Sequence, residues 1–388
     1  MNPTLHTSNH PERAVIAAYR RSPFTPAGKG GLARVRPDDL AAQVCRRMLD
    51  DAGLDPATLE DVLVGCAFPE GEQGLNLARM VGFLCDLPDT VAGLTLNRFC
   101  GSSMQSIHSA VGSIASGAGE AFVCGGVESM TRVPMAGFNP LPNPRLVERR
   151  PQVMTSMGET AEIIAREFGI ARSVQEEFAL ASHEKAERAR AAGHFADELV
   201  SITAEHGDVA ADGCIRADTS LEALAQLKPV FDAAGTVTAG TSSPTADGAA
   251  MTLVCSRAYA EAQGLQPLAT VVATAVSGCA PERMGIGPVD ASRKALARAG
   301  LTLDDIDVIE LNEAFASQAL AVVESLGLAP DRLNLDGGAL ALGHPLGASG
   351  ARITGKAATI LARTGGRYAL AAMCIGGGQG IATVLAAN

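Results

Sequence analysis

Apolar and polar positions along the chain follow a pattern that repeats once at long range. The stretch RMLDDAGLDPATLEDVLVGCAF (residues 47–68) aligns without gaps, from its second residue on, with ALARAGLTLDDIDVIELNEAF (295–315). Each stretch indicates an amphipathic helix, a turn and an apolar strand, because apolar residues first recur at helical spacing and then run continuously. Nearly the same offset aligns residues 101–122 with 347–368, where a glycine-rich turn opens a helix of small residues before a further apolar strand. Two halves built on one plan are therefore predicted.

The alternation of helix and strand in each half predicts an α/β fold with mainly parallel sheets and helices on their faces. We expect an N-terminal half over residues 1–262 and a C-terminal half over residues 263–388. Within the first half, residues from about 125 to 244 interrupt the repeat and are expected to form an inserted loop domain. This insertion would lie over the junction of the two repeated sheets, where we expect it to cover or shape a site.

The inserted segment has two distinct parts. Residues 133–151 (VPMAGFNPLPNPRLVERRP) are rich in proline and predict an irregular loop. A helix is predicted at about 174–192, with Ser173 and Glu176 forming a capping box at its start and Gly193 ending it.

Composition narrows the class of protein. Hydrophobic residues make up 47% of the chain and charged residues 19%, which excludes a disordered chain. A net charge of −11, no basic block, no Trp and three Tyr argue against binding nucleic acid through its phosphates. No run of 18 apolar residues exists and the first thirty residues lack an apolar signal core, so the cytoplasm is the expected compartment. Nine cysteines without a C-x-x-C pair indicate reduced thiols, and no metal site is expected.

Two glycine-rich turns carry candidate groups for nucleophilic catalysis. Cys100 lies in LNRFCGSSMQSI (96–107) at the predicted start of a helix, where the helix dipole and free N–H groups favour the thiolate. His344 lies in GGALALGHPLGASGAR (337–352), which the repeat places at the equivalent strand-to-helix elbow of the second half. A cysteine paired with a histidine is the usual arrangement for activating a thiol. Taken alone, each side chain is more often a buried structural residue than a catalytic one.

Two further motifs end apolar strands. Cys374 in AAMCIGGGQGIA is followed by three glycines, which let backbone N–H groups approach a ligand as in an oxyanion hole. Cys124 in AFVCGGVE is its near twin, and the pattern alone does not decide which of the two is functional. Asn312 and Glu313 close another apolar strand, so they either face a site or form a buried structural contact.

In this order, these segments resemble the thiolase family almost from end to end. The resemblance includes YRRSPFTPAGKGGL, NRFCGSSMQS, GGVESM, MGETAE, AGTSSPTADGAA, LNEAFASQ, GGALALGHPLGASGAR and CIGGGQG. It implies a duplicated α/β core of five layers, αβαβα, with an inserted loop domain. By the same resemblance Cys100 is the acylated cysteine, His344 its activating base, Cys374 the second cysteine and Asn312 the ligand of an oxyanion-hole water. The N–H groups of Cys100 and Gly376 form the other oxyanion hole.

The resemblance also implies the substrates and the assembly. It places Ser243, Met157, Met284, Phe315 and Lys228 in the coenzyme A site. Coenzyme A is then a co-substrate, with no permanently bound cofactor. A homodimer or homotetramer is implied, and the bacterial β-oxidation type works in a complex with a hydratase/dehydrogenase subunit.

Two positions depart from the family pattern. Asp336 stands where asparagine is more common, and Lys228 stands where arginine is frequent. Both departures affect the expected positioning of coenzyme A and of the loop domain rather than the expected reaction.

Three functions fit the resemblance to different degrees. Its motifs are closer to degradative 3-ketoacyl-CoA thiolases than to biosynthetic acetoacetyl-CoA thiolases, which share the catalytic residues and differ in chain-length preference. A non-catalytic acyl-CoA carrier is a remote alternative, because all four catalytic side chains are present. The proline-rich loop is expected to set the acyl chain length, with Met135, Phe138 and Leu141 lining the site.

Overall fold

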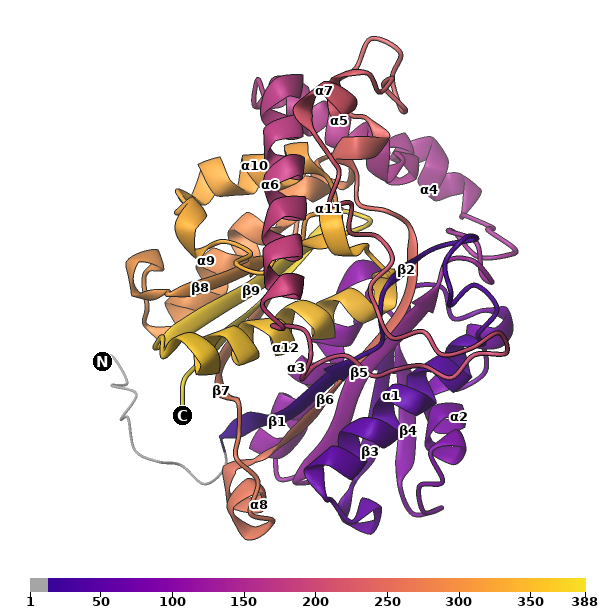
Figure 1. Ribbon diagram of the computed structural model, residues 1–388, viewed down its shortest axis with the longest axis vertical. Helices are drawn as coiled ribbons and strands as arrows, with labels where there is room; N and C mark the ends of the chain where they lie inside the picture. The colour runs from indigo at the N-terminus through magenta and orange to yellow at the C-terminus, as the bar shows by residue number, and fades with distance from the viewer. Residues whose placement is uncertain (1–12) are drawn as a thin grey trace.

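The computed structural model describes residues 13–388, whose strands form one continuous sheet (Figure 1). The strand order is β4-β3-β5-β6-β1-β7-β10-β9-β8, with the short β2 paired to β6. The strands of the first half are β1 (Ala14–Arg21), β2 (Thr25–Pro26), β3 (Asp61–Gly65), β4 (Ala92–Leu96), β5 (Ala121–Ser129) and β6 (Ala246–Ser256). Those of the second half are β7 (Ala269–Gly278), β8 (Val308–Leu311), β9 (Tyr368–Ile375) and β10 (Gln379–Ala386). A short β1–β7 pairing joins the two halves.

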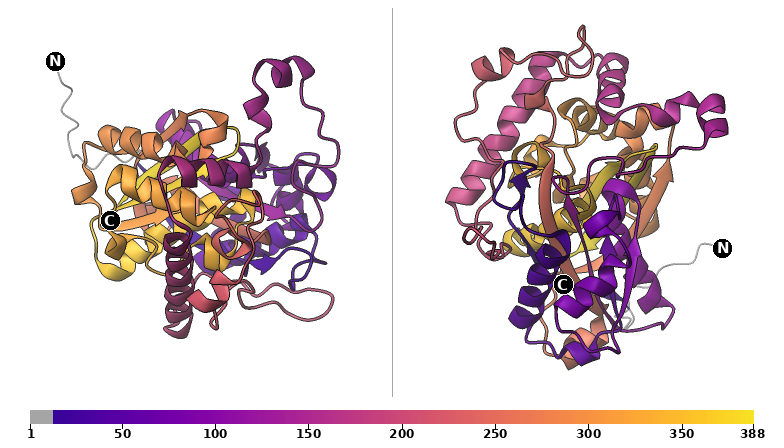
Figure 2. Two further views of the ribbon diagram at one scale, coloured as in Figure 1. Left: turned by 90° about the horizontal axis from the view of Figure 1, so that it is seen from above. Right: turned by 90° about the vertical axis from the view of Figure 1, so that its right-hand side faces the viewer.

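Helices separate and cover the two half-sheets (Figures 1 and 2). Helices α1 (Pro37–Ala52) and α2 (Leu77–Leu84) pack on the outer face of the first half-sheet. Helices α9 (Gly287–Ala299) and α10 (Ala316–Leu326) cover the outer face of the second. Between the half-sheets lie α3 (Ser102–Ala115) and α12 (Leu346–Thr364), and α12 packs against strands of both. The result is the predicted five-layer αβαβα core.

The two halves repeat the same pairing pattern, as the sequence predicted. Strands β3 and β5 are parallel and β6 and β1 continue antiparallel, just as β8 and β9 are parallel and β10 and β7 continue antiparallel. Helices α1 and α9 end at Gly53 and Gly300, whose φ angles of 62° and 68° are left-handed. A left-handed helix end favours glycine because it has no Cβ. These two glycines are paired by the sequence repeat.

The expectation of mainly parallel sheets was wrong. Within residues 13–388 only β3–β4, β3–β5 and β8–β9 are parallel pairs. The three glycines at 376–378 join β9 to β10 directly, and so short a connection permits only an antiparallel pair. In the first half the inserted segment leaves the end of β5 and returns beside it, so that Ser129 pairs with Asp247 and β6 runs antiparallel to β5.

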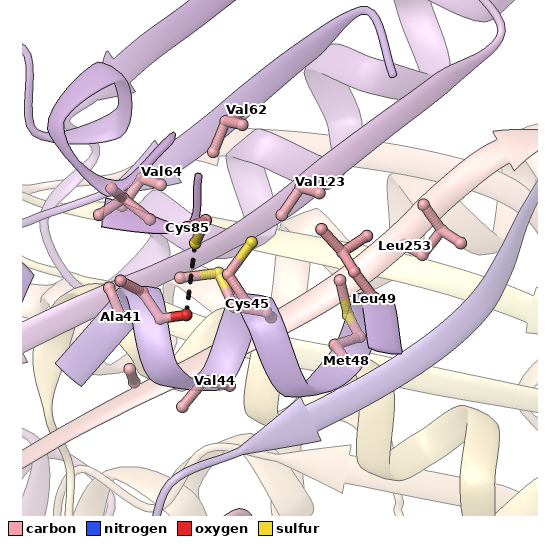
Figure 3. Packing of buried hydrophobic residues seen from close by; sticks show 14 of the residues in the cluster. Ala41, Val44, Cys45, Met48, Leu49, Val62, Val64, Cys85, Val123 and Leu253 are labelled. Carbon is pink, nitrogen blue, oxygen red and sulfur yellow. Dashed lines mark hydrogen bonds between the residues drawn. The ribbon is translucent and has the colours of Figure 1, made fainter. Parts of the chain in front are cut away.

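The core of the first half forms where α1 meets its half-sheet (Figure 3). Val44, Cys45 and Met48 on α1 are fully buried, and Figure 3 shows Cys45 and Leu49 on the side of the helix that faces Val123 and Leu253 of the sheet. Burying one such side chain contributes about 1.5–3 kcal/mol, so this face holds α1 firmly in place. None of the helices that the structure describes has the length and apolar character needed to cross a membrane.

The inserted segment adds helices above the core (Figure 1). They are α4 (Pro144–Arg149), α5 (Met157–Glu167), α6 (Arg172–Ala191) and α7 (Leu221–Ala225). The predicted helix at 174–192 is α6, but the predicted capping box is absent. Its N-cap is Ala171, and Glu176 instead accepts a hydrogen bond from Arg172 one turn earlier, at 2.6 Å.

The proline-rich stretch 133–151 was expected to be irregular, but it contains α4. The side chain of Asn143 caps this helix by accepting from the N–H of Arg145, and Pro144 is its first residue, where a missing N–H costs nothing. Figure 2 shows α4 near the tip of an arm that projects from the body. The remaining elements are α8 (Arg257–Ala262), α11 (Ala339–Leu342) and the short 3-10 helices η1 (Pro56–Thr58), η2 (Gly71–Gln73), η3 (Phe99–Gly101), η4 (Pro151–Met154), η5 (Ala239–Thr241), η6 (Pro281–Ile286), η7 (Leu303–Asp305) and η8 (Pro330–Arg332).

Buried ion pairs tie the inserted segment to the core. Glu198 of the insertion accepts from Arg21 on β1 at 2.7 Å and from Lys356 on α12 at 2.8 Å. Lys356 also pairs with Asp336 at 2.9 Å, and Asp336 pairs with Arg363 at 2.8 Å. Burial alone would raise the pKa of Asp336, but the Arg363 hydrogen bonds and the charge of Lys356 lower it to about 2. Asp336, which departs from the family pattern, is therefore an anchor of the second half.

Candidate active site

A pocket of about 260 Å³ lies between the two halves, beneath the inserted segment. Seven of the ten side chains and backbone positions predicted for the site line it: Cys100, Met157, Ser243, Met284, Phe315, His344 and Cys374. Sulfur-bearing and aromatic side chains dominate the lining, so the pocket suits an apolar chain with a few polar atoms at its end.

Cys100 is presented by a strained turn. It lies in η3, between β4 and α3, and the preceding Phe99 has a left-handed φ of 43°. Such a conformation costs about 1–3 kcal/mol for a residue other than glycine, and it persists only where neighbouring contacts enforce it. Here the N–H of Phe99 donates to the Asn97 side chain at 2.8 Å, and its carbonyl accepts from Ser102 Oγ at 2.6 Å. The turn therefore fixes the direction of the Cys100 side chain.

The resting Cys100 is a thiol, contrary to the prediction from its position at a helix start. Burial raises its pKa from 9.0 to about 11. The N–H groups of Gly376 and of Cys100 itself face the sulfur and lower the pKa, but they only partly offset the loss of water. Desolvation outweighs the helix dipole here because Cys100 is only 9% exposed. The nucleophile consequently needs a base.

His344 lines the same pocket as Cys100. It lies between α11 and α12, and the expected strand before it is replaced by the short helix α11. The Ser349 hydroxyl donates to the carbonyl of Pro345 at 2.9 Å, so it accepts from His344 Nδ1 at 2.6 Å. This assigns the proton to Nδ1 and leaves Nε2 with a free lone pair.

The charge state of His344 follows from its surroundings. Burial and then the Arg352 guanidinium lower its pKa from 6.5 to about 3, so the imidazole is neutral at physiological pH. Asn312 Nδ2 lies 3.4 Å from Nε2 and can donate to it. A neutral imidazole oriented from its Nδ1 side is the form that accepts a proton at Nε2.

Ser349 was not predicted as a site residue. The sequence feature that could have identified Ser349 is its position five residues after His344, in a helix start that otherwise carries small residues.

Cys374 closes the opposite side of the pocket. It is the penultimate residue of β9 and is 1% exposed. Burial, and next the neighbouring Cys100, raise its pKa well above the usual value, so it too is a thiol. Cys124, its twin in sequence, instead lies in an apolar cluster with Leu63, Ile107 and Phe122, away from the pocket. Cys124 is thus a structural residue.

The sequence left open whether Asn312 and Glu313 face a site or form a buried structural contact, and the structure gives a different answer for each. Asn312 is fully buried at the end of β8, and its Oδ1 has no partner among the described residues. Glu313 accepts from Ser182 at 2.7 Å, from Asn334 at 2.7 Å and from the N–H of Leu340 at 3.1 Å. The Glu313 carboxylate therefore has a structural role. The side-chain oxygen of Asn312, beside His344, can still accept a hydrogen bond.

Of the other residues predicted for the site, the structure places some at the pocket and others away from it. Gly376 contributes its N–H to the Cys100 sulfur without lining the pocket, while Lys228 is exposed in the segment after α7 and does not line it. Met135 lines the pocket as expected, but Phe138 and Leu141 are 59% and 82% exposed and do not. Pocket residues that sequence reasoning missed include Met130, Phe231 and Leu346. Met130 and Leu346 lie within the GGVESM and GGALALGHPLGASGAR motifs, but nothing in those motifs shows that these two side chains face the pocket.

Comparisons with known proteins cover nearly all of the described chain. Residues 14–258 match the thiolase N-terminal domain, and residues 265–387 match the thiolase C-terminal domain. The chain belongs to the thiolase family. This thiolase is 44% identical over 386 residues to a 3-ketoacyl-CoA thiolase of Bacillus subtilis, covering 96% of this chain and 99% of that protein.

Two solved structures share the fold of this thiolase. The human mitochondrial 3-ketoacyl-CoA thiolase superposes with a TM-score of 0.90 at 38% identity, over 98% of this chain and 100% of that one. The Bacillus anthracis acetyl-CoA acetyltransferase superposes with a TM-score of 0.89 at 38% identity, over 97% of this chain and 99% of that one. The fold is therefore common to thiolases named for cleavage and for acetyl transfer.

Proposed function

We propose that the protein is an acetyl-CoA C-acyltransferase that cleaves 3-ketoacyl-CoA with coenzyme A, giving acetyl-CoA and a shortened acyl-CoA. The observation that carries this proposal is the meeting of two thiols and one neutral imidazole in a single apolar pocket. One thiol can form a covalent bond while the other moves a proton, which is what cleavage of a carbon–carbon bond next to a thioester requires.

In the first half-reaction, the Cys100 sulfur attacks the keto carbon while His344 Nε2 takes the thiol proton. The carbon–carbon bond then breaks, and its electron pair passes to the enolate of acetyl-CoA. Cys374 gives this enolate its thiol proton, which releases acetyl-CoA and leaves the shortened acyl group on Cys100. Burial supports this order, because both thiols are protonated before substrate binds.

In the second half-reaction, coenzyme A gives its thiol proton to the Cys374 thiolate and attacks the acyl carbon. The Cys100 sulfur leaves and recovers its proton from His344, so every group returns to its starting state. Negative charge develops on the acyl oxygen in both half-reactions. The N–H groups of Cys100 and Gly376 are the donors we assign to that oxygen, and Asn312 beside His344 is the group we assign to a water that binds the thioester oxygen. The kinetics are then of the ping-pong type.

We also propose the setting of this reaction. The enzyme acts in the cytoplasm with coenzyme A as co-substrate and without a permanently bound cofactor, as a homodimer or homotetramer. Ser243, Met157, Met284, Phe315 and Lys228 are the residues we assign to the coenzyme A site. A complex with a hydratase/dehydrogenase subunit would supply the 3-ketoacyl substrate. We assign residues 1–262, with the insertion, and residues 263–388 to two halves of one catalytic unit, because the pocket is lined by residues of both.

Synthesis of acetoacetyl-CoA by an acetyl-CoA C-acetyltransferase is the second candidate function, favoured by the close likeness to the Bacillus anthracis enzyme. The two functions differ in chain length. Cleavage by coenzyme A should therefore be measured for 3-ketoacyl-CoAs from acetoacetyl-CoA to long-chain substrates. We expect kcat/KM to rise with chain length beyond acetoacetyl-CoA. Activity confined to acetoacetyl-CoA would favour the second candidate, and no cleavage of any substrate would reject both.

A further inference from the structure

Arg98 and Gln379 connect the turn that carries Cys100 with the glycine turn that follows Cys374. Arg98 precedes Cys100 by two residues, and Gln379 is the first residue of β10, directly after the glycine turn. Arg98 Nη1 donates to Gln379 Oε1 at 3.0 Å. Gln379 Nε2 donates in turn to the carbonyl of Gly376 at 3.4 Å. One chain of hydrogen bonds thus runs from the nucleophile turn of the first half to the glycine turn of the second.

The Arg98 end of this chain is fixed to α3. Its backbone N–H donates to Ser102 Oγ at 2.8 Å, and its Nε donates to Gln105 Oε1 at 2.9 Å. Over residues 13–388 the guanidinium forms no ion pair and instead bonds two amide oxygens. A rigid fork of donors with no carboxylate to neutralise is suited to fixing geometry.

The glycine end has little else to hold it. Gly377 and Gly378 have left-handed φ angles of 78° and 80°, and Gly377 is exposed. Glycine has more conformational freedom than any other residue, so such a turn needs outside contacts to keep one shape. The carbonyl of Gly378 accepts from the N–H of Cys279 at 2.8 Å, and Gln379 supplies the bond to Gly376. The N–H of Gly376 is the one that faces the Cys100 sulfur.

We propose that Arg98 and Gln379 are positioning residues, which hold the Gly376 N–H in place as the donor to the acyl oxygen on Cys100. This inference rests on the proposed thiolase function. The pair acts through Gly376 and touches neither the sulfur nor the substrate in our account. It also links the conformations of the two halves, because the nucleophile comes from one half and its oxyanion donor from the other.

If Arg98 and Gln379 hold the Gly376 N–H in place, then breaking their hydrogen bonds should slow acyl transfer but not proton transfer. A displaced oxyanion donor typically costs about 10- to 100-fold in rate, so acetylation of Cys100 by acetyl-CoA should slow by that factor. Exchange of the α protons of acetyl-CoA with deuterated water uses Cys374, with Asn312 beside the thioester oxygen, and should change less than about threefold. A general loosening of the fold would lower both rates together.

Two variants of Gln379 distinguish its hydrogen bond with Arg98 from its hydrogen bond with Gly376, and a third variant serves as a control. Gln379→Met removes both side-chain hydrogen bonds, and Gln379→Glu still accepts from Arg98 but cannot donate to Gly376. Gln263→Met is the matched control, because Gln263 is exposed at the end of α8, far from the pocket. Acetylation of Cys100 is measured by rapid acid quench and mass spectrometry, and exchange is followed by NMR in deuterated water.

The proposal predicts slowed acetylation in both Gln379 variants, nearly unchanged exchange, and wild-type behaviour of Gln263→Met. Acetylation at the wild-type rate in Gln379→Glu, or an equal fall of acetylation and exchange in both variants, would overturn it. A wild-type protein that is neither acetylated nor able to cleave any 3-ketoacyl-CoA would instead reject the thiolase function itself.

Discussion

Replacing His344 by glutamine tests the assignment of the base most closely. Glutamine has a similar size and can both donate and accept a hydrogen bond, but its amide does not take a proton. In the wild-type protein the pKa of Cys100 is about 11, so at pH 8 roughly one molecule in a thousand carries a free thiolate. A cysteine with the ordinary pKa of 9.0 would carry it in about one molecule in ten. Burial therefore makes the thiolate about 3 kcal/mol less favourable.

Two consequences follow for the rate of acylation. His344 Nε2 removes the proton during attack, and the pKa of about 3 keeps this nitrogen unprotonated throughout the neutral range. Acylation of the wild-type enzyme should accordingly depend little on pH between about pH 7 and about pH 9. His344→Gln depends on the rare preformed thiolate, so its acylation at pH 8 should be about 10²- to 10³-fold slower. It should then rise about tenfold per pH unit as the thiolate fraction grows.

The assay is rapid mixing with a 3-ketoacyl-CoA, acid quench, and mass spectrometry of the acylated protein at several pH values. Circular dichroism and the thermal midpoint establish that the variant is folded. Acylation of His344→Gln that is as fast as wild type, or slow yet independent of pH, would refute the reasoning. In either case the thiol would be losing its proton by another route.

Three further changes give separate results. Cys374→Ala should still accept an acetyl group from acetyl-CoA on Cys100, but it should not exchange the α protons of acetyl-CoA with deuterated water; normal exchange would contradict its acid/base role. Replacing residues 133–151 by a shorter polar loop removes Met135 from the pocket and should lower kcat/KM for long-chain substrates, with acetoacetyl-CoA cleavage nearly unchanged; an equal loss for all chain lengths would point to folding instead. The pKa of Asp336 is about 2 in the folded protein and 3.8 when unperturbed, so its stabilising contribution is present above about pH 4 and is lost as the pH falls toward 2. Urea unfolding at pH 7 and at low pH should show this loss, up to about 2 kcal/mol, in wild type and not in Asp336→Asn; an identical pH dependence of the two proteins would refute it.

Local sequence pattern predicted the repeat and most of the strand and helix positions, but it did not predict strand direction. The glycines at 376–378 are visible in the sequence as a turn, yet only the pairing of β9 with β10 shows that this turn reverses the chain. The capping box predicted at Ser173 failed because helix α6 begins earlier, where Arg172 pairs with Glu176. Arg172 also donates to the carbonyls of Leu224, Ala225 and Leu227, and such long-range contacts leave no periodic signal in the sequence.

The site was predicted residue by residue from motifs, whereas its electrostatics needed the structure. The sequence places Cys100 before a helix and so favours a thiolate, but the degree of burial that reverses this effect depends on chain segments far away in sequence. The same holds for Ser349, Met130 and Leu346, whose role arises from where the pocket lies. Lys228 shows the opposite case, a residue expected at the site by resemblance that the structure places on the surface outside the pocket.

The covalent bond to Cys100 is the central claim of this account. The most direct measurement incubates the protein with a 3-ketoacyl-CoA in the absence of free coenzyme A, quenches with acid and maps the added mass by peptide mass spectrometry. The shortened acyl group should be found on the peptide that contains Cys100, and it should disappear in Cys100→Ala. An acyl group on Cys374 or Cys124 of the wild-type protein, or no acyl group during active cleavage, would contradict the account.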